Sequence, residues 1–159
     1  MISEREKQAA RNFASGCNCA QSVLLTYADV LGLTQEQAAM VAVGFGGGMG
    51  RLRDNCGAFS AAVMLCGALE GANGAKKEHR PQTYARVQEM HRRFLERFGT
   101  INCAELLDRD PGPEAPVPEE RTPAYYKSRP CARIIRLTCQ IIDEMMAEQA
   151  AAGEGTHDA

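Results

Sequence analysis

The segment 56–71, CGAFSAAVMLCGALEG, is apolar or small on every side of a helix, and this feature constrains the fold more than any other. A helix that lacks a polar face has to be covered on all sides, so the segment predicts a buried central helix. The small residues near its start allow neighbouring backbones to come close. These residues are Gly57, Ala58, Ala61 and Ala62.

Further helices are predicted on both sides of this segment, because apolar residues recur at helical spacing and few β-branched runs occur. Capping residues mark the starts of these helices, and glycines mark several ends. We expect helices from Ser3 to near Gly16, over 19–31 and 35–44, over 81–98, shortly after Asn102, and after Pro130. Five of the seven prolines fall within 108–123, so this stretch is predicted to be an extended surface connection.

The predicted fold class is therefore all-α. We expect a single domain over residues 1–149, built as a bundle of six or seven helices with a Pro-rich loop near 108–123. The last residues, 150–159, are rich in small and polar side chains and are predicted to form a disordered tail.

The composition argues against several classes of function. The chain has 159 residues and a formal net charge of −2 without a basic block, so neither nucleic acid nor an anionic membrane is indicated as a partner. The N-terminal segment lacks the apolar stretch of a signal peptide, and no run of about 18 apolar residues predicts membrane insertion. We therefore expect a cytoplasmic protein. In a reducing cytoplasm, seven cysteines favour metal binding or transient redox chemistry over structural disulfides.

Four of the cysteines lie in the first turn of a predicted helix: Cys19, Cys56, Cys103 and Cys131. Unpaired backbone N–H groups and the positive end of the helix dipole favour an anion there, and a thiolate is such an anion. The pKa of a cysteine at a helix N-terminus can fall to roughly 3.5–7.5. The pattern thus predicts four thiolate-favouring positions. No C-x-x-C occurs, so a thioredoxin motif, a zinc ribbon and a c-type haem site are not indicated.

The remaining three cysteines differ in their setting. Cys66 in the central helix and Cys139 on the inner side of the last helix are predicted to be buried small hydrophobes. Cys17 allows two interpretations: a resolving thiol beside Cys19, or an incidental neighbour.

A glycine-rich loop, GFGGGMG at 44–50, precedes Cys56. It contains neither G-x-G-x-x-G nor G-x-x-x-x-G-K and follows no predicted strand, so a nucleotide phosphate loop is not favoured. Its glycines instead allow positive φ values or a close approach to a cluster, an ion or a second thiol. The candidate cofactor-binding residues are Gly46, Gly47, Gly48, Gly50 and Arg51. Arg51 and Arg53 either add positive charge near Cys56 or are solvated side chains.

Four segments in order carry a resemblance to a known family: GCNCAQSVLL (16–25), FGGGMGRLRDNCGAFSAAVM (45–64), FGTINCAELL (98–107) and the late Cys131. Together they resemble the C_GCAxxG_C_C family, small proteins named for four cysteines and described as redox-active. The resemblance implies that the family cysteines are the same four that lie at predicted helix starts. One position departs from the family motif, since Ala61 stands where the family has its last glycine.

Three functions are compatible with these features. The first is a thiol redox protein or oxidoreductase, in which one cysteine attacks and a second resolves a mixed disulfide; the pair is expected to include Cys56, with Cys19 or Cys103. The second is a metal centre, with Zn²⁺ or an iron–sulfur cluster bound by Cys19, Cys56, Cys103 and Cys131. The third is a helical interaction module with incidental cysteines. Because the four cysteines are widely spaced and form no compact ligand motif, we rank thiol redox chemistry ahead of metal binding. The expected partner is a redox protein or a small molecule, and a homo-oligomer is compatible with the apolar last helix.

Overall fold

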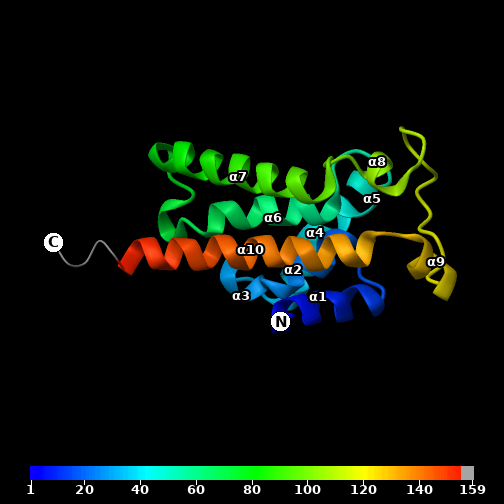
Figure 1. Ribbon diagram of the computed structural model, residues 1–159, viewed down its shortest axis with the longest axis horizontal. Coiled ribbons are helices and arrows are strands. Elements are labelled where there is room, and N and C mark those ends of the chain that lie inside the picture. Colours follow the sequence, from blue (N-terminus) through cyan, green and yellow to red (C-terminus); the bar gives the residue numbers. More distant parts are fainter. Residues whose placement is uncertain (155–159) are drawn as a thin grey trace.

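The computed structural model describes residues 1–154, and these form an all-α bundle (Figure 1). Six helices of the described chain have seven residues or more. They are α1 (Glu4–Ala14), α2 (Cys19–Thr26), α4 (Gln35–Ala42), α6 (Gly57–Ala68), α7 (Arg80–Phe98) and α10 (Cys131–Glu154). The shorter ones are α3 (Ala28–Leu31), α5 (Gly46–Met49), α8 (Cys103–Leu107) and α9 (Pro123–Ser128), with 3-10 turns η1 (Val43–Phe45), η2 (Gly71–Asn73) and η3 (Lys77–His79). No strand occurs in this part of the chain, and the predicted fold class is confirmed.

Helix α6 is the central helix of the bundle, as its sequence predicts. It packs against α2, α7 and α10, and eight of its residues are buried. Gly57 allows the backbone of α6 to lie close to the backbones of Phe45 and Ala20. A Cβ at this position would lie 2.7 Å from the carbonyl oxygen of Phe45 and 3.1 Å from the backbone nitrogen of Ala20. Ala61 is completely buried. Its methyl group is therefore accommodated at the position where the family has glycine.

The predicted helix starts agree closely with the structure. Ser3, Asn18 and Thr34 are the N-caps of α1, α2 and α4, and each forms a capping box. The expected continuous helix over 19–31 is wrong at one residue, however. The backbone leaves helical geometry at Tyr27 (φ −115°, ψ 20°) and divides the segment into α2 and α3.

Tyr27 shows why this break is a property of the tertiary structure. Its ring is fully buried, and its hydroxyl donates to Asp143 Oδ1 at 2.7 Å and to the carbonyl oxygen of Cys139 at 3.0 Å. A buried phenol needs such partners for its polar end. The two bonds fasten the junction of α2 and α3 to α10, where Ile135, Ile141 and their neighbours form the buried side.

The C-terminal helix is longer than expected. Residues 150–154, predicted to belong to a disordered tail, are the last five residues of α10. The rest of that predicted tail, 155–159, lies outside the described residues.

The starts of α6, α8 and α10 lie at one end of the bundle, whereas α7 begins at the other end (Figure 1). In Figure 1, α6 and α10 begin at the end where α5, α8 and α9 lie, and the Pro-rich segment 108–122 runs along the same end. Among residues 1–154, no helix has the length and apolar character needed to span a membrane. Because helices that begin with the predicted site cysteines start at the end where the Pro-rich segment lies, this end of the bundle is the candidate location of the functional site.

Candidate thiol site

The structure places each of the four predicted site cysteines at a helix N-terminus. Cys19, Cys103 and Cys131 are the first residues of α2, α8 and α10. Cys56, which the sequence placed in the first turn of a helix, is the N-cap of α6. The four elements bring their first turns to the same end of the bundle.

Backbone pairing joins two of these helix starts directly. The N–H of Cys56 donates to the carbonyl oxygen of Ile101 at 2.7 Å, and the N–H of Cys103 donates to that of Asp54 at 2.6 Å. These bonds flank an isolated antiparallel bridge between Asn55 and Asn102. Cys56 and Cys103 are separated by 47 positions in the chain, yet main-chain hydrogen bonds hold their two segments side by side.

The glycine-rich loop allows the cysteine-bearing segments to come this close. A Cβ at Gly48 would lie 2.5 Å from the Cβ of Cys103, and a Cβ at Gly46 would overlap the side chain of Asn18. Gly47, Gly48 and Gly50 also have positive φ values, as do Met49 and Arg51. The expectation of close approach is confirmed, and the groups approached are Cys103 and the cap of α2. A cofactor role for the loop stays a prediction.

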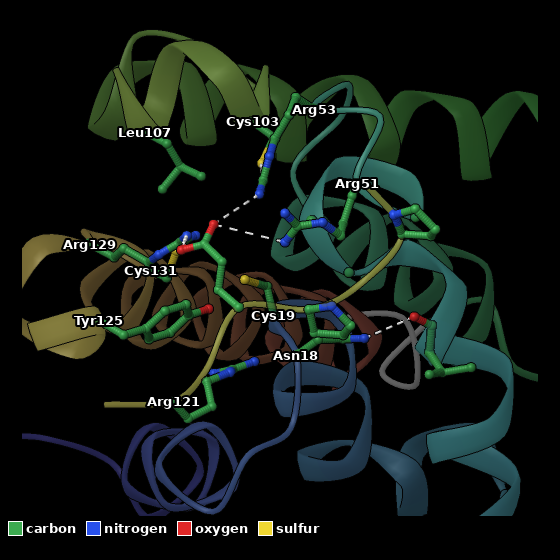
Figure 2. Close-up of a pocket in the computed structure, with 17 residues that line it drawn as sticks. Asn18, Cys19, Arg51, Arg53, Cys103, Leu107, Arg121, Tyr125, Arg129 and Cys131 are labelled. Atoms are coloured by element: carbon green, nitrogen blue, oxygen red, sulfur yellow. Dashed lines mark hydrogen bonds and ion pairs between the residues drawn. The ribbon is translucent and has the colours of Figure 1, made fainter. Parts of the chain in front are cut away.

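A cavity of about 330 Å³ lies among these helix starts (Figure 2). Cys19, Cys103 and Cys131 line it, although Cys103 and Cys131 are buried in the protein; Cys56, equally buried, is not among the lining residues. Of the predicted cofactor-binding residues, Gly46, Gly47, Gly50 and Arg51 contribute to the wall, and Gly48 lies beneath it against Cys103. Other lining residues are Arg53, Tyr125, Arg121, Arg129 and Glu119.

Cys131 and Cys19 line the same cavity, and their pKa values are shifted in opposite directions. Hydrogen bonding from the Cys19 thiol, aided by the charges of Arg129 and Arg121, lowers the pKa of Cys131 to about 7 against the effect of burial. The same interaction, together with burial, raises the pKa of Cys19 well above its ordinary value. These shifts favour loss of the proton from Cys131 before Cys19.

Burial dominates at the other two sites. It raises the pKa of Cys56 to about 12, although the backbone N–H groups of Phe59 and Ala58 act in the opposite direction. Burial also raises the pKa of Cys103, against the opposing effect of Arg53, whose Nη1 lies 3.7 Å from the sulfur. The prediction that a helix start lowers the pKa of all four cysteines is thus wrong for Cys19, Cys56 and Cys103. At Cys19 the interaction with Cys131 is the largest cause and burial adds to it. At Cys56 and Cys103 removal from water is the largest cause.

Arginines and two glutamates connect the thiols to the Pro-rich segment. Arg53 has 2% of its side chain exposed and lies 2.6 Å from Glu114 and 3.7 Å from Glu119. Arg51 also pairs with Glu114 at 2.6 Å, and Arg129 lies 2.5 Å from Glu119. Arg53 is the main cause that lowers the pKa of Glu114 to about 2, and Arg109, 2.7 Å from Glu119, followed by Arg129, lowers that of Glu119 to about 2. Arg51 and Arg53 are therefore engaged in ion pairs and are not simply solvated.

The other cysteines lie apart from the cavity wall. Cys66 and Cys139 are completely buried in α6 and α10, as expected for small hydrophobes, and burial raises the pKa of Cys66 to about 11 and that of Cys139 to about 12. Cys17 lies half-buried in the connection before α2, where its carbonyl oxygen accepts a hydrogen bond from Arg121 at 3.4 Å. Its role as a resolving thiol stays a prediction.

The donor geometry does not match a metal centre. Within residues 1–154, no group of three or more His, Cys, Asp or Glu side chains is arranged to hold a metal ion. Only Cys19, Cys103 and Cys131 of the four predicted ligands line the cavity, and Cys56 lies outside its lining. The arrangement therefore does not fit four convergent ligands to Zn²⁺ or a cluster.

Sequence reasoning missed the residues that surround Cys131. Arg121, Tyr125 and Arg129 line the cavity, and Glu119 comes from the stretch interpreted as a surface connection. One signal was present in the sequence: Arg129 stands two positions before a cysteine at a predicted helix start. The pairing of the Pro-rich segment with Arg51 and Arg53 had no local signal.

The fold and the site define a class: an all-α protein with four cysteines at the helix starts of one end, three of them around an arginine-rich cavity. The chain belongs to the C_GCAxxG_C_C family, described as "Putative redox-active protein (C_GCAxxG_C_C)", whose model matches residues 17–145. Membership supports a redox role at a coarse level. No curated protein and no solved structure matches the chain.

Proposed function

We propose that the chain carries out thiol–disulfide exchange, with Cys131 as the attacking thiol and Cys19 as the resolving thiol. The observation that carries this proposal is that Cys19 and Cys131 line the wall of one cavity. An attacking cysteine has to be a thiolate that the substrate can reach, whereas a resolving cysteine has to lie beside it. Cys131 is only 7% exposed, but it lines the cavity and its pKa is lowered, and these properties support its role as the attacking thiol.

The reaction proceeds in two displacements. The Cys131 thiolate attacks one sulfur of a substrate disulfide, so that a mixed disulfide forms and the first substrate thiolate leaves. The sulfur of Cys19 then attacks the sulfur of Cys131, the second substrate thiolate leaves, and the proton of Cys19 passes to a departing thiolate. Two electrons move from the protein pair to the substrate, which leaves as one thiol, carrying the proton of Cys19, and one thiolate, which takes a proton from water according to the pH. An external dithiol has to reduce the Cys19–Cys131 disulfide before the next cycle.

The sequence placed Cys56 in the reacting pair, and that assignment stays a prediction. A pKa of about 12 leaves Cys56 protonated at neutral pH, and Cys56 does not line the cavity, so these properties support Cys131 as the first thiol to react. We propose the cytoplasm as the setting, because its reducing poise maintains such a pair as a dithiol.

The test uses the full-length chain, reduced and purified without oxygen, with bis(2-hydroxyethyl) disulfide as the oxidant. We expect peptide mapping by mass spectrometry to find a Cys19–Cys131 disulfide. Cys19→Ser should stop at a mixed disulfide on Cys131, and Cys131→Ser should lose fast exchange. The rate constant should rise with pH and level off above a midpoint near 7, because only the thiolate attacks.

Cys17→Ser is the matched control, since it removes a half-buried thiol two positions from Cys19. It should leave both the disulfide and the rate unchanged. A disulfide that forms at Cys17 in its place, or fast exchange that persists in Cys131→Ser, would refute the assignment of roles.

The two other hypotheses from the sequence have tests of their own. The metal-centre hypothesis predicts that the anaerobically purified chain contains iron or zinc in stoichiometric amount and that its cysteines do not react with the disulfide. The interaction-module hypothesis predicts that a variant with serine at all four cysteines still binds a cellular partner. The cavity geometry supports exchange over both.

A further inference from the structure

Positive charge is concentrated around the thiol cavity, although the chain as a whole has a formal net charge of −2. Four arginines line the cavity, and the single lining carboxylate is that of Glu119. Figure 2 shows Arg51, Arg53, Arg121 and Arg129 arranged around the space in front of Cys19 and Cys131. With the Cys131 thiolate and Glu114 included, the arginines still exceed the anionic groups.

Three of these guanidinium groups have a buried nitrogen that makes no hydrogen bond to the described residues: Nε of Arg53, Nη1 of Arg121 and Nη2 of Arg129. The last of these contacts Glu119 as an ion pair. The Arg121 guanidinium is stacked on the ring of Tyr125, 4.6 Å from its centroid, which fixes its position at the cavity. A buried donor without an acceptor is costly, and an anionic ligand supplies the acceptor.

The position of Glu119 indicates that the arginines around the cavity can bind a carboxylate. Its carboxylate reaches in from the Pro-rich segment and lies 2.5 Å from Nη2 of Arg129 and 3.7 Å from Nη2 of Arg53. The chain thus places one of its own carboxylates beside the arginines that flank Cys131. A carboxylate of a ligand would meet the same donors together with the free Nη1 of Arg121.

The remaining wall suits a short carbon chain. Leu107, Val43, Pro116 and the ring of Tyr125 contribute apolar surface to the cavity. Its volume of about 330 Å³ lies at the lower end of small-molecule sites, which range over roughly 300–1,000 Å³. A folded protein cannot enter such a space, whereas a small disulfide can.

We propose that the substrate class is low-molecular-weight disulfides that carry carboxylates, held by Arg121 and Arg129 while Cys131 attacks the sulfur. This inference rests on the proposed thiol–disulfide exchange. The displacement is the one written above: the Cys131 thiolate bonds to one substrate sulfur, and the second half of the disulfide leaves as a carboxylate-bearing thiolate.

The experiment compares three small disulfides that differ in charge: 3,3′-dithiodipropionate (anionic), bis(2-hydroxyethyl) disulfide (neutral) and cystamine (cationic). Each rate constant is measured at low salt and divided by that for free 2-mercaptoethanol, which corrects for intrinsic reactivity. We expect the normalised anionic rate to exceed the neutral rate by on the order of tenfold, and the cationic rate to be the slowest.

The informative quantity is the anionic-to-neutral ratio, because a change in the pKa of Cys131 alters both rates equally. Arg121→Gln and Arg129→Gln should bring this ratio close to one, and Glu119→Gln should raise it by removing a competing carboxylate. Arg133→Gln is the matched control. It removes a charge two positions from Cys131 on the exposed side of α10, outside the cavity lining, and should leave the ratio unchanged.

The outcomes separate this inference from the proposed function. If none of the disulfides reacts at Cys131, thiol–disulfide exchange itself fails. If all react without a charge preference, exchange stands and the carboxylate site is refuted. A preference that survives in both Arg121→Gln and Arg129→Gln also overturns the inference, because the selectivity then arises elsewhere.

Discussion

The glycine at position 48 has a specific role in assembling the thiol site, and Gly48→Ala tests that role. A Cβ at this position would lie 2.5 Å from the Cβ of Cys103 and 2.7 Å from the backbone nitrogen of Asp54. The second contact is with backbone, so a side-chain rotation cannot relieve it. The residue also has a φ of +67°, which disfavours any side chain.

Two energies add for this substitution. The left-handed backbone costs an alanine about 1–2 kcal/mol relative to glycine. Excess volume at a packed position costs about 1–3 kcal/mol more. Gly50→Ala is the matched control, because Gly50 has a φ of +58° but its nearest neighbour would lie 3.8 Å from the added Cβ. Only the backbone cost applies there, so the two variants should differ by about 1–3 kcal/mol.

Urea denaturation of both variants measures this difference. With a slope of roughly 1–3 kcal/mol per molar urea, the midpoint of Gly48→Ala should lie about 1 M below that of Gly50→Ala. Alkylation of Cys103 should also accelerate in Gly48→Ala alone, since the contact with Cys103 has to open. Equal midpoints in the two variants would refute the close-packing role of Gly48.

Two further predictions concern the fastening of the fold and of the Pro-rich segment. Tyr27→Phe removes the hydroxyl that bonds to Asp143 and to the Cys139 carbonyl, so it should destabilise the chain by about 1–3 kcal/mol in urea denaturation; an unchanged midpoint would contradict this. Glu114 and Glu119 have pKa values of about 2, below their ordinary 4.5. Their ion pairs should therefore be fully present above pH 4.5 and be lost as the pH falls toward 2, so pepsin should cleave 108–122 faster at pH 2.5 than at pH 4.5 relative to an unstructured peptide. Equal relative rates would argue against these ion pairs.

The sequence predicted those parts of the fold that depend on local chemistry. Capping side chains such as Ser3, Asn18 and Thr34 act on N–H groups three residues away, so helix starts can be read along the chain. The same local signals correctly predicted that Cys19, Cys103 and Cys131 lie at helix starts. The break at Tyr27 was not predictable in this way, since its hydroxyl partners lie on α10, more than 110 positions further along.

The thiol pKa values depend on distant residues in the same manner. A position at a helix start is a local property, but burial and neighbouring charges are set by the whole fold. Cys131 has a lowered pKa because Cys19 donates to it and because Arg129 and Arg121 lie near, whereas burial prevails at Cys56. Four similar sequence positions therefore become four different thiols.

The ion pair between Arg53 and Glu114 allows the pKa of Cys103 to be changed by a substitution in the Pro-rich segment. Arg53 lies 3.7 Å from the sulfur of Cys103 through Nη1 and 2.6 Å from Glu114 through Nη2. Glu114→Gln removes the nearer of the two carboxylates that face Arg53 and leaves only Glu119, at 3.7 Å, to offset the positive charge beside Cys103. Since a nearby cation favours thiolate, the pKa of Cys103 should fall and its alkylation at pH 8 should accelerate.

Site-resolved alkylation with iodoacetamide across a pH series measures this change. Glu120→Gln is the matched control, because it removes an equal charge from an exposed side chain of the same segment. Pepsin cleavage of 108–122 reports separately on release of the segment, which would expose Cys103 and also lower its pKa. A segment that stays protected while the pKa of Cys103 falls supports coupling through Arg53. An unchanged or higher pKa in Glu114→Gln would show that Arg53 does not transmit the charge of the Pro-rich segment to the thiol.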